Sequence, residues 1–362
     1  MKRLIAAFAL SAVLLAAPSF ADDKTVRVYN WSDYIDESIL SEFEAETGIK
    51  VVYDVFDSNE ILETKLLAGS TGYDVVVPSA EFLARQIEAG VFQKLDKGKL
   101  PNLENAWNVI EERVAVYDPD NAYSVNYMWG TTGIGYNVEK IKEIMPDAPV
   151  NSWELIFNPD ILAKFSECGV QILDAPAEVI PAALNYLGLD PDTKNPEDIE
   201  KAGELLDKIR PHVQKFHSSE YINALANGDI CLAVGWSGDV LQARDRAAEA
   251  DNGVTISYVI PQEGAQMWFD QMAIPADAPN AEAAHAFIDF ILRPEIAARA
   301  SNYVYYANGN EASKPLLNED VIGDTAIYPD EETTGNLFTK MPYPPRVQRV
   351  VTRTWTRVKS GT

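Results

Sequence analysis

The sequence is poor in the residues that bind metals or act as thiol catalysts. Its 362 residues include two cysteines and three histidines, and no CxxC pair is present. His212 and His217 lie five residues apart, without the HExxH spacing of a zinc-binding helix. We therefore expect no metal ion, and we interpret these two residues and His285 as structural or surface histidines.

The usual motifs of nucleotide-binding and hydrolytic enzymes are also missing. The chain has no GxxxxGK[ST] loop, and the glycines of 130–135 do not open a helix after a strand as GxGxxG does. Residues 235–238, GWSG, fall short of the GxSxG nucleophile elbow. We therefore expect no P-loop, no dinucleotide or other cofactor, and no catalytic residues.

Long apolar runs are absent after the start of the chain. Lys2 and Arg3 precede the apolar segment Leu4–Ala17, and Ser19 and Ala21 supply small side chains at the two positions that a signal peptidase reads. The segment is shorter than the roughly 20 apolar residues that cross a bilayer. We expect residues 1–21 to be a signal peptide and the mature chain to be exported. No cysteine follows the cleavage site, so a lipid anchor is not expected.

Positive charge is scarce relative to negative charge. Lys and Arg number 30 against 55 Asp and Glu, and the net charge of −25 falls by two, to −27, without the signal peptide's basic residues. Such a chain should repel nucleic acid and anionic membranes and attract cations. The acidity also fits a chain that only needs to stay soluble, and both interpretations remain open.

The two cysteines of the sequence are Cys168 and Cys231. In an oxidising compartment such a pair usually forms a disulfide. The closed loop of about 63 residues would then stabilise the fold by up to about 4 kcal/mol, because it lowers the entropy of the unfolded chain.

Strands and helices alternate over the first hundred residues. Apolar runs predict strands at Thr25–Tyr29, Lys50–Val55 and Tyr73–Val77. Helical periodicity and stop signals predict helices at Glu37–Thr47, at Asn59–Ala68 and from Ser79 to Gly90. This order indicates an open α/β sheet, which binds ligands outside the carboxyl ends of its strands.

A second α/β unit follows, and a mature chain of about 340 residues suits two domains. The predicted strands are Gly169–Leu173, Ile230–Val234, Val254–Ile260 and Met272–Ile274. The predicted helices are Ala182–Leu187, Asp198–Lys208, Tyr221–Asn227 and Ala281–Leu292. The glycine-rich run Trp129–Asn137 is predicted to be an extended strand that crosses between two lobes.

Aromatic residues stand beside acids at several places. The groups are Trp31/Asp33/Tyr34, Trp236/Asp239 and Trp268/Phe269/Asp270, with Tyr303, Tyr305 and Tyr306 as a further cluster of rings. A chain with 7 Trp, 16 Tyr, 13 Phe and 55 acids contains such neighbours by chance, so spacing alone favours core rings and solvated acids. The first two groups, however, follow strands that look buried, where an open sheet has its ligand cleft.

Ten stretches, in order along the mature chain, form a recognisable set. They are YNWSDYI, TGIKVVYDVFDSNE, KLLAGSTGYDVVVPS, WGTTGIGYNV, AALNYLGLDP, FHSSEYINALANGDICLAVGWSGDV, MWFDQMAIPADA, HAFIDFILRPE, YVYYAN and TRTWTRVKSG. The set resembles the periplasmic polyamine-binding proteins of bacterial ABC transporters, most closely the putrescine-binding type. Because it spans nearly the whole mature chain, it is far more specific than any single motif.

The resemblance implies a two-lobed α/β solute-binding fold of type II, with a mixed sheet flanked by helices in each lobe and the ligand in the cleft between them. Lobe 1 would contain residues 22–130 and about 258–308, and lobe 2 residues from about 131–257 and 309–362. The resemblance also implies a bond between Cys168 and Cys231. It further implies a periplasmic monomer without enzymatic activity, a polyamine ligand, no nucleic acid, and an ABC transporter permease as partner.

The family's ligand positions carry over one at a time. They are Trp31, Ser32, Asp33, Tyr34, Ser79, Glu178, Trp236, Asp239, Trp268, Asp270 and Tyr306. We expect Asp239 and Asp270 at one ammonium of the ligand, and Asp33 or Glu178 nearer the other. The three tryptophans would form the walls, and Ser79 and Tyr306 would be hydrogen-bonding partners. One departure is Ala177, where family members often carry a further acid, which leaves the selectivity of the loop and the role of Glu178 open.

Three alternatives remain open. Spermidine, another diamine or a cationic amino acid would suit the same fold, although no arginine for an amino acid's carboxylate stands beside these motifs. Acids beside tryptophans would also suit an exported glycoside hydrolase. A receptor that signals through a partner would carry the same sequence features.

Overall fold

The computed structural model describes residues 25–361. The predicted signal peptide, residues 1–21, lies outside the described residues. Within residues 25–361 no helix is both long enough and apolar enough to span a bilayer.

In the described part of the chain, ten strands form one connected sheet in the order β2-β1-β3-β9-β4-β7-β5-β6, with β8 and β10 both paired to β4. Their bounds are β1 Thr25–Trp31, β2 Lys50–Phe56, β3 Val75–Val76, β4 Ser124–Asn137, β5 Val170–Ile172, β6 Lys215–Phe216, β7 Leu232–Trp236, β8 Ile256–Val259, β9 Met267–Ala273 and β10 Ala307–Asn308. Parallel pairs join β1 to β2 and β3, and β5 to β6 and β7, whereas β4 pairs antiparallel with all its neighbours. The predicted α/β class with mixed sheets is confirmed.

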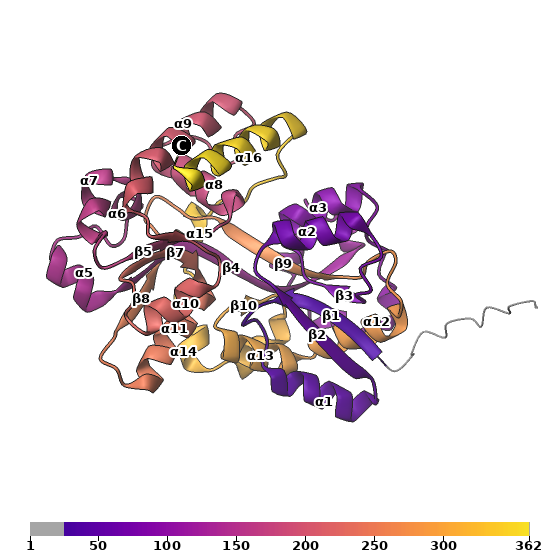
Figure 1. Cartoon of the computed structure of the whole chain (residues 1–362). Coiled ribbons are helices and arrows are strands. Elements are labelled where there is room, and N and C mark those ends of the chain that lie inside the picture. The colour runs from indigo at the N-terminus through magenta and orange to yellow at the C-terminus, as the bar shows by residue number, and fades with distance from the viewer. Residues whose placement is uncertain (1–24, 362) are drawn as a thin grey trace, which may run out of the picture.

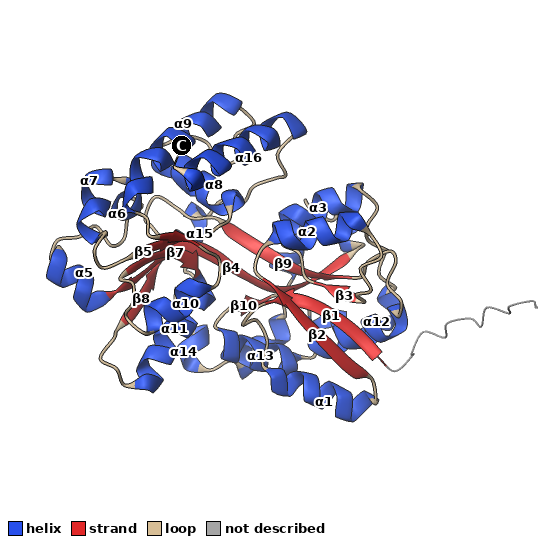
Figure 2. Cartoon of the chain, in the orientation of Figure 1, coloured by secondary structure: helices blue, strands red, loops and turns tan. Residues whose placement is uncertain are grey.

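Helices cover both faces of the strands (Figure 2). Their bounds are α1 Glu37–Thr47, α2 Asn59–Ala68, α3 Ala80–Glu88, α4 Asn108–Val114, α5 Val138–Ile144, α6 Glu154–Phe157, α7 Pro159–Leu162, α8 Pro176–Tyr186, α9 Pro196–Ile209, α10 Glu220–Ala226, α11 Ser237–Ala250, α12 Ala281–Ile291, α13 Pro294–Val304, α14 Glu319–Ile322, α15 Glu331–Asn336 and α16 Pro345–Ser360. Short 3₁₀ turns link several of them.

The long strand β4 divides the sheet into two lobes (Figure 1). Its residues Ser124–Thr131 pair with β9, whereas Thr132–Asn137 pair with β7 and β8. We call β1, β2, β3, β9, β10 and the first part of β4 lobe 1, and β5 to β8 with the second part of β4 lobe 2. Each lobe has its own hydrophobic core, with Met128 of β4 in one and Ile134 in the other. The predicted crossing strand at Trp129–Asn137 is confirmed, and it begins five residues earlier than expected.

The first helices form where the capping residues place them. Asp36 accepts a hydrogen bond from the backbone N–H of Ser38 at the start of α1, and Ser58 accepts one from Ile61 at the start of α2. Gly48 ends α1 in the left-handed region at φ 70°, where a glycine is favoured. Both predicted helices have the observed bounds because these signals are local.

Two predictions about later elements were wrong, and one later helix was missed. The helix α8 begins at Pro176 instead of Ala182, so Pro181 lies inside it instead of marking its start. The helix α11 was not predicted, although it directly follows the last residue of β7. The strand β9 begins at Met267 instead of Met272, because its pairing with β4 runs from Met267 to Ala273 and includes polar residues that interrupt the apolar pattern.

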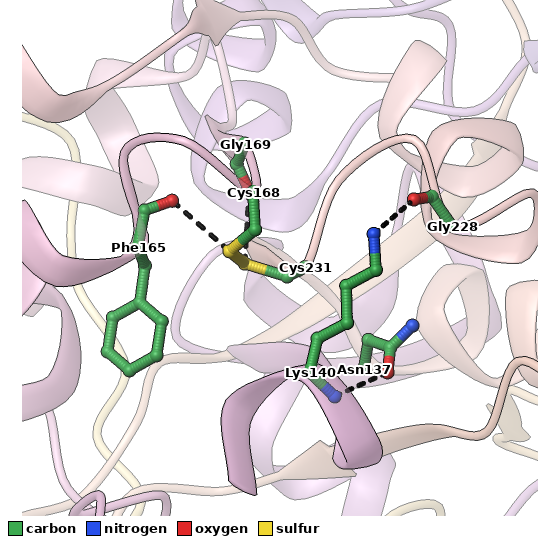
Figure 3. The surroundings of a disulfide bond; sticks show 7 residues. All are labelled: Asn137, Lys140, Phe165, Cys168, Gly169, Gly228 and Cys231. Carbon is green, nitrogen blue, oxygen red and sulfur yellow. Dashed lines mark hydrogen bonds between the residues drawn. A yellow bond between two sulfur atoms is a disulfide. The ribbon is translucent and has the colours of Figure 1, made fainter. Parts of the chain in front are cut away.

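A disulfide joins Cys168 to Cys231 in lobe 2, as predicted, with 5.5 Å between the Cα atoms (Figure 3). Cys231 directly precedes β7 and Cys168 lies two residues before its partner strand β5, and the backbone N–H of Cys231 donates to the carbonyl oxygen of Gly169 at 3.0 Å. The Lys140 ammonium donates to the Gly228 carbonyl oxygen at 3.1 Å nearby. These contacts secure the end of the lobe 2 sheet that lies away from Trp236.

Candidate functional site

One pocket of about 420 Å³ collects the side chains at the carboxyl ends of strands from both lobes. We call it the interlobe pocket, and its lining residues are Trp31, Ser32, Tyr34, Asp57, Ser79, Glu178, Ser218, Trp236, Asp239, Trp268, Asp270 and Tyr306. Trp31 and Trp236 are the last residues of β1 and β7, so the two parallel parts of the sheet both deliver a ring to it. This agrees with the expectation that an open sheet places its site outside strand ends.

Asp270 on β9 is held by hydroxyl groups of lobe 1. The hydroxyl of Ser79 donates to its Oδ1 at 2.6 Å, and the hydroxyl of Tyr34 donates to its Oδ2 at 2.8 Å. Ser79 is itself positioned by Asn59, whose amide donates to the Ser79 hydroxyl at 3.0 Å. Each oxygen thus receives one neutral donor, and further acceptor capacity remains because an ionised carboxylate offers about four acceptor sites.

Asp239 in the first turn of α11 has a matching environment on the other side. The hydroxyl of Tyr306 donates to its Oδ1 at 2.7 Å, and that of Tyr221 donates to its Oδ2 at 2.8 Å. The same tyrosine oxygens accept backbone N–H groups, Tyr306 from Asp239 at 3.1 Å and Tyr221 from Trp236 at 3.1 Å. Both hydroxyl groups are therefore oriented to donate to the carboxylate.

Gly238 makes the contact between α11 and Tyr306 possible. A Cβ atom at this position would lie 2.4 Å from the Tyr306 ring, closer than real Cβ contacts allow. The glycine of the GWSGD stretch is therefore a packing requirement, because it lets the tyrosine ring lie against the helix and reach Asp239.

Burial changes the titration of three acids of the interlobe pocket. It raises the pKa of Asp239, of Asp270 and of Glu178 to about 7 in each case. The hydroxyl donors lower these pKa values only in part, because a neutral donor offsets little of the cost of removing a charge from water. The charge of Asp239 raises the pKa of Asp270 further.

Glu178 lies in the first turn of α8 and is bound to the crossing strand. The hydroxyl of Thr132 donates to its Oε2 at 2.5 Å. Thr132 is the residue of β4 at which pairing with β7 begins, and its backbone N–H still donates to Gln266 beside β9 at 3.1 Å. Glu178 therefore contacts β4 at the boundary between the two lobes.

Aromatic rings form the walls between these acids. Trp31 and Trp236 meet edge to face with centroids 5.5 Å apart, and Trp268 and Tyr306 lie 5.4 Å apart. The Tyr34 and Tyr306 rings lie 5.1 Å apart, so the tyrosines that hold Asp270 and Asp239 contact each other. The indole N–H of Trp31 donates to the Val77 carbonyl oxygen at 2.9 Å, which fixes the ring.

The predicted site residues come together with one exception. All of them line the interlobe pocket except Asp33. Asp33 has a left-handed φ of 52°, and its half-exposed carboxylate forms an ion pair with Arg246 of α11 at 2.7 Å. The structure therefore places Asp33 beside the pocket, in a contact between the lobes, instead of in the pocket lining.

Three residues that sequence reasoning missed take part in this site. Asp57 follows β2 and accepts a hydrogen bond from the Ser32 hydroxyl at 2.8 Å, so its position after a predicted strand was a usable signal. Ser218 follows β6 and lines the pocket. Tyr221 holds Asp239 from 18 residues away, and no local pattern indicated that contact.

The lining has the chemistry of a cation site. It contains four carboxyl groups, and no Lys, Arg or His is among these lining residues of the described chain. Rings attract cations through their faces, and carboxylates accept charge-assisted hydrogen bonds from ammonium groups. A small organic cation with apolar carbon between charged ends fits both features, whereas an anion would face these carboxyl groups without a basic partner among the lining residues.

Comparison with known proteins agrees with this geometry. Residues 38–327 match the family model for bacterial extracellular solute-binding proteins. The chain is 53% identical to the putrescine-binding periplasmic protein SpuD of Pseudomonas aeruginosa over 365 aligned positions, which cover 100% of both chains. It is 54% identical to the putrescine-binding periplasmic protein PotF of Escherichia coli, covering 94% of this chain and 93% of that one.

The fold also matches a solved structure. The spermidine/putrescine ABC transporter substrate-binding protein PotD of Streptococcus pneumoniae superposes with a TM-score of 0.75 at 31% identity. The match covers 93% of this chain and 99% of that chain. The predicted two-lobed solute-binding fold is therefore confirmed.

Proposed function

The chain belongs to the bacterial extracellular solute-binding proteins, and we propose that it captures putrescine, or a closely related polyamine, between its two lobes and delivers it to an ABC transporter permease. Its relatives SpuD and PotF carry putrescine binding in their names. The observation that carries the proposal is the interlobe pocket, which joins buried acids to aromatic walls without a basic side chain. We place the mature protein in the periplasm, because these relatives are periplasmic proteins and residues 1–21 read as a signal peptide.

Putrescine has the two charged ends and the apolar carbon chain that suit the interlobe pocket. Its two amines, with lysine-like pKa values near about 10.4, are charged at neutral pH and are separated by four methylene groups. Charge-assisted hydrogen bonds contribute about 1.5–3 kcal/mol each, and each cation–π contact about 0.5–2 kcal/mol. A few such terms, less the costs of ordering and desolvation, reach micromolar binding at about −8 kcal/mol.

The contacts among the acids support an assignment of the two ends. Tyr34, which holds Asp270, and Tyr306, which holds Asp239, touch each other, so we assign both acids to one ammonium. Glu178 comes from α8 on another wall and is assigned to the second ammonium. Asp33, whose carboxylate pairs with Arg246, contributes to the contact between the lobes in this proposal.

Ligand contacts from both lobes would favour the closed arrangement. Asp239 belongs to the helix after β7 in lobe 2, and Asp270 belongs to β9 in lobe 1. A cation held by both can contact them at once only when the lobes are together, so binding shifts the population towards that state. A permease that recognises the closed form would then receive loaded protein.

The test is calorimetry of Asp239→Asn with putrescine and spermidine. Loss of one charge-assisted bond should weaken putrescine binding by about tenfold or more. Asp245→Asn is a matched control, because Asp245 lies on the same helix and also accepts a tyrosine hydroxyl, that of Tyr305, outside the interlobe pocket. Unchanged affinity in Asp239→Asn, or turnover of oligosaccharides by the wild type, would contradict the proposal.

A further inference from the structure

A second cavity of about 320 Å³ adjoins the interlobe pocket and contains a buried ion pair. We call it the Lys340 chamber, and it shares three lining residues with the interlobe pocket, Ser79, Glu178 and Trp268. Beyond these shared residues, Glu81 of α3 forms a salt bridge with Lys340. The side chain of Lys340 is 0% exposed and that of Glu81 is 9% exposed, so both charges are removed from water.

Lys340 is held firmly in this position by its own segment. The segment between α15 and α16 pairs with the start of β9, where the N–H of Met267 donates to the Phe338 carbonyl oxygen at 2.8 Å. The hydroxyl of Tyr117 donates to the carbonyl oxygen of Lys340 at 3.0 Å. The Lys340 ammonium lies 4.3 Å from the centroid of the Tyr343 ring.

The surroundings of this ammonium resemble those of the interlobe pocket. A lysine side chain is four methylene groups ending in an ammonium, and here it meets a carboxylate and an aromatic face. A further buried acceptor of the chamber, Oε1 of Gln266, has no hydrogen-bond partner within the described residues. The chamber therefore has the chemistry to accept an alkylammonium, and the chain's own lysine already lies in its wall.

A buried ion pair is weak evidence for a stabilising role. Removing two charges from water costs roughly what their attraction returns, so hydrophobic residues of similar volume often serve a fold equally well. The pair also acts on the neighbouring site. Burial is the main cause that raises the pKa of Glu178, while the charge of Glu81 raises it further and that of Lys340 lowers it.

We propose that Lys340 is a specificity-determining residue, whose ammonium lines the chamber beside Glu178 and excludes the third ammonium of a longer polyamine. This inference rests on the proposed function and adds the preference for diamines over linear triamines. A triamine that spans the interlobe pocket has to place its extra cation beyond one end. At the Glu178 end, that cation meets the fixed positive charge of Lys340, and Glu81 is already neutralised by the same lysine.

The experiment compares dissociation constants for putrescine and spermidine by calorimetry in wild type and Lys340→Met. The variant keeps a side chain of similar length and leaves the Glu81 carboxylate free to bind the third ammonium. The affinity for spermidine relative to putrescine should rise at least tenfold. Lys194→Met is a matched control, because the Lys194 ammonium also lies near the Tyr343 ring, at 5.3 Å, but pairs with Asp192 outside the chamber.

The double variant Glu81→Gln/Lys340→Met guards against misfolding caused by a lone buried charge. It removes the repulsion without offering a new carboxylate, so the relative affinity for spermidine should rise, but less than in Lys340→Met. An unchanged ratio in the double variant, or parallel losses for both amines, would overturn the role of Lys340. A wild type that binds no polyamine would instead overturn the proposed function.

Discussion

Lowering the pH from 8 to 6 should weaken polyamine binding, because the ligand's carboxylate partners take up protons in that range. Burial raises the pKa of Asp239 and of Asp270 to about 7. An ammonium needs the ionised acid, so each carboxyl that is protonated in the free protein must lose its proton on binding. The affinity for the polyamine is therefore greatest above the raised pKa and falls as the pH drops through it.

The magnitude follows from linkage. For one carboxyl with a pKa of about 7 that must be ionised to bind, the dissociation constant rises roughly tenfold between pH 8 and pH 6. Glu178, whose pKa is also raised to about 7, is a third such carboxyl, so the upper figure is roughly 1000-fold, equivalent to about 4.1 kcal/mol. Putrescine itself does not contribute, because its amines stay charged throughout this range.

Calorimetry in two buffers of different ionisation enthalpy measures this effect. Near pH 6 the number of protons released on binding should approach one per carboxyl, and it should approach zero at pH 8. In Asp239→Asn the released fraction should fall, because one titrating group is gone. An affinity that is constant between pH 6 and pH 8, with no proton release, would refute the reasoning.

Two further outcomes are expected. Gly238→Ala should weaken putrescine binding by about tenfold or more, as measured by calorimetry. The added Cβ would displace the Tyr306 ring, which holds the Asp239 carboxylate that binds the ammonium. An affinity equal to that of wild type would show that the ring is not fixed by this contact. Cys168→Ser/Cys231→Ser should lower the free energy of unfolding by up to about 4 kcal/mol in denaturant titrations, since it reopens a loop with a sequence separation of 63 residues. No change in stability in the double serine variant would contradict the chain-entropy account.

Much of the fold could be read locally from the sequence. The first helices are defined by capping residues such as Asp36 and Ser58, which lie next to the helices that they cap. The rule that open sheets bind ligands at carboxyl ends then placed Trp31 and Trp236 at the site. The helix α8 was misplaced because Pro181, usually a boundary, is tolerated inside it.

What the sequence did not indicate depends on contacts between distant residues. The family resemblance indicated Asp270, but the local pattern did not, because Asp270 stands inside β9 and its position follows from pairing with strands that are far away in the chain. Lys340 meets Glu81 across 259 residues, and no local pattern marks either one. Asp33 is near the interlobe pocket in sequence but does not line it. Its neighbours Trp31 and Tyr34 do not determine the direction of its side chain, which a left-handed backbone turns towards Arg246.

The strand β4 limits how the two halves of this molecule can be separated or exchanged. Its backbone supplies hydrogen-bonding partners to β9 in one lobe and to β7 and β8 in the other. A gene cut anywhere within Ser124–Asn137 would break this one continuous strand between two fragments. Chimeras that recombine lobes from different relatives therefore have to inherit this strand as a single unit, together with the neighbours that pair with it.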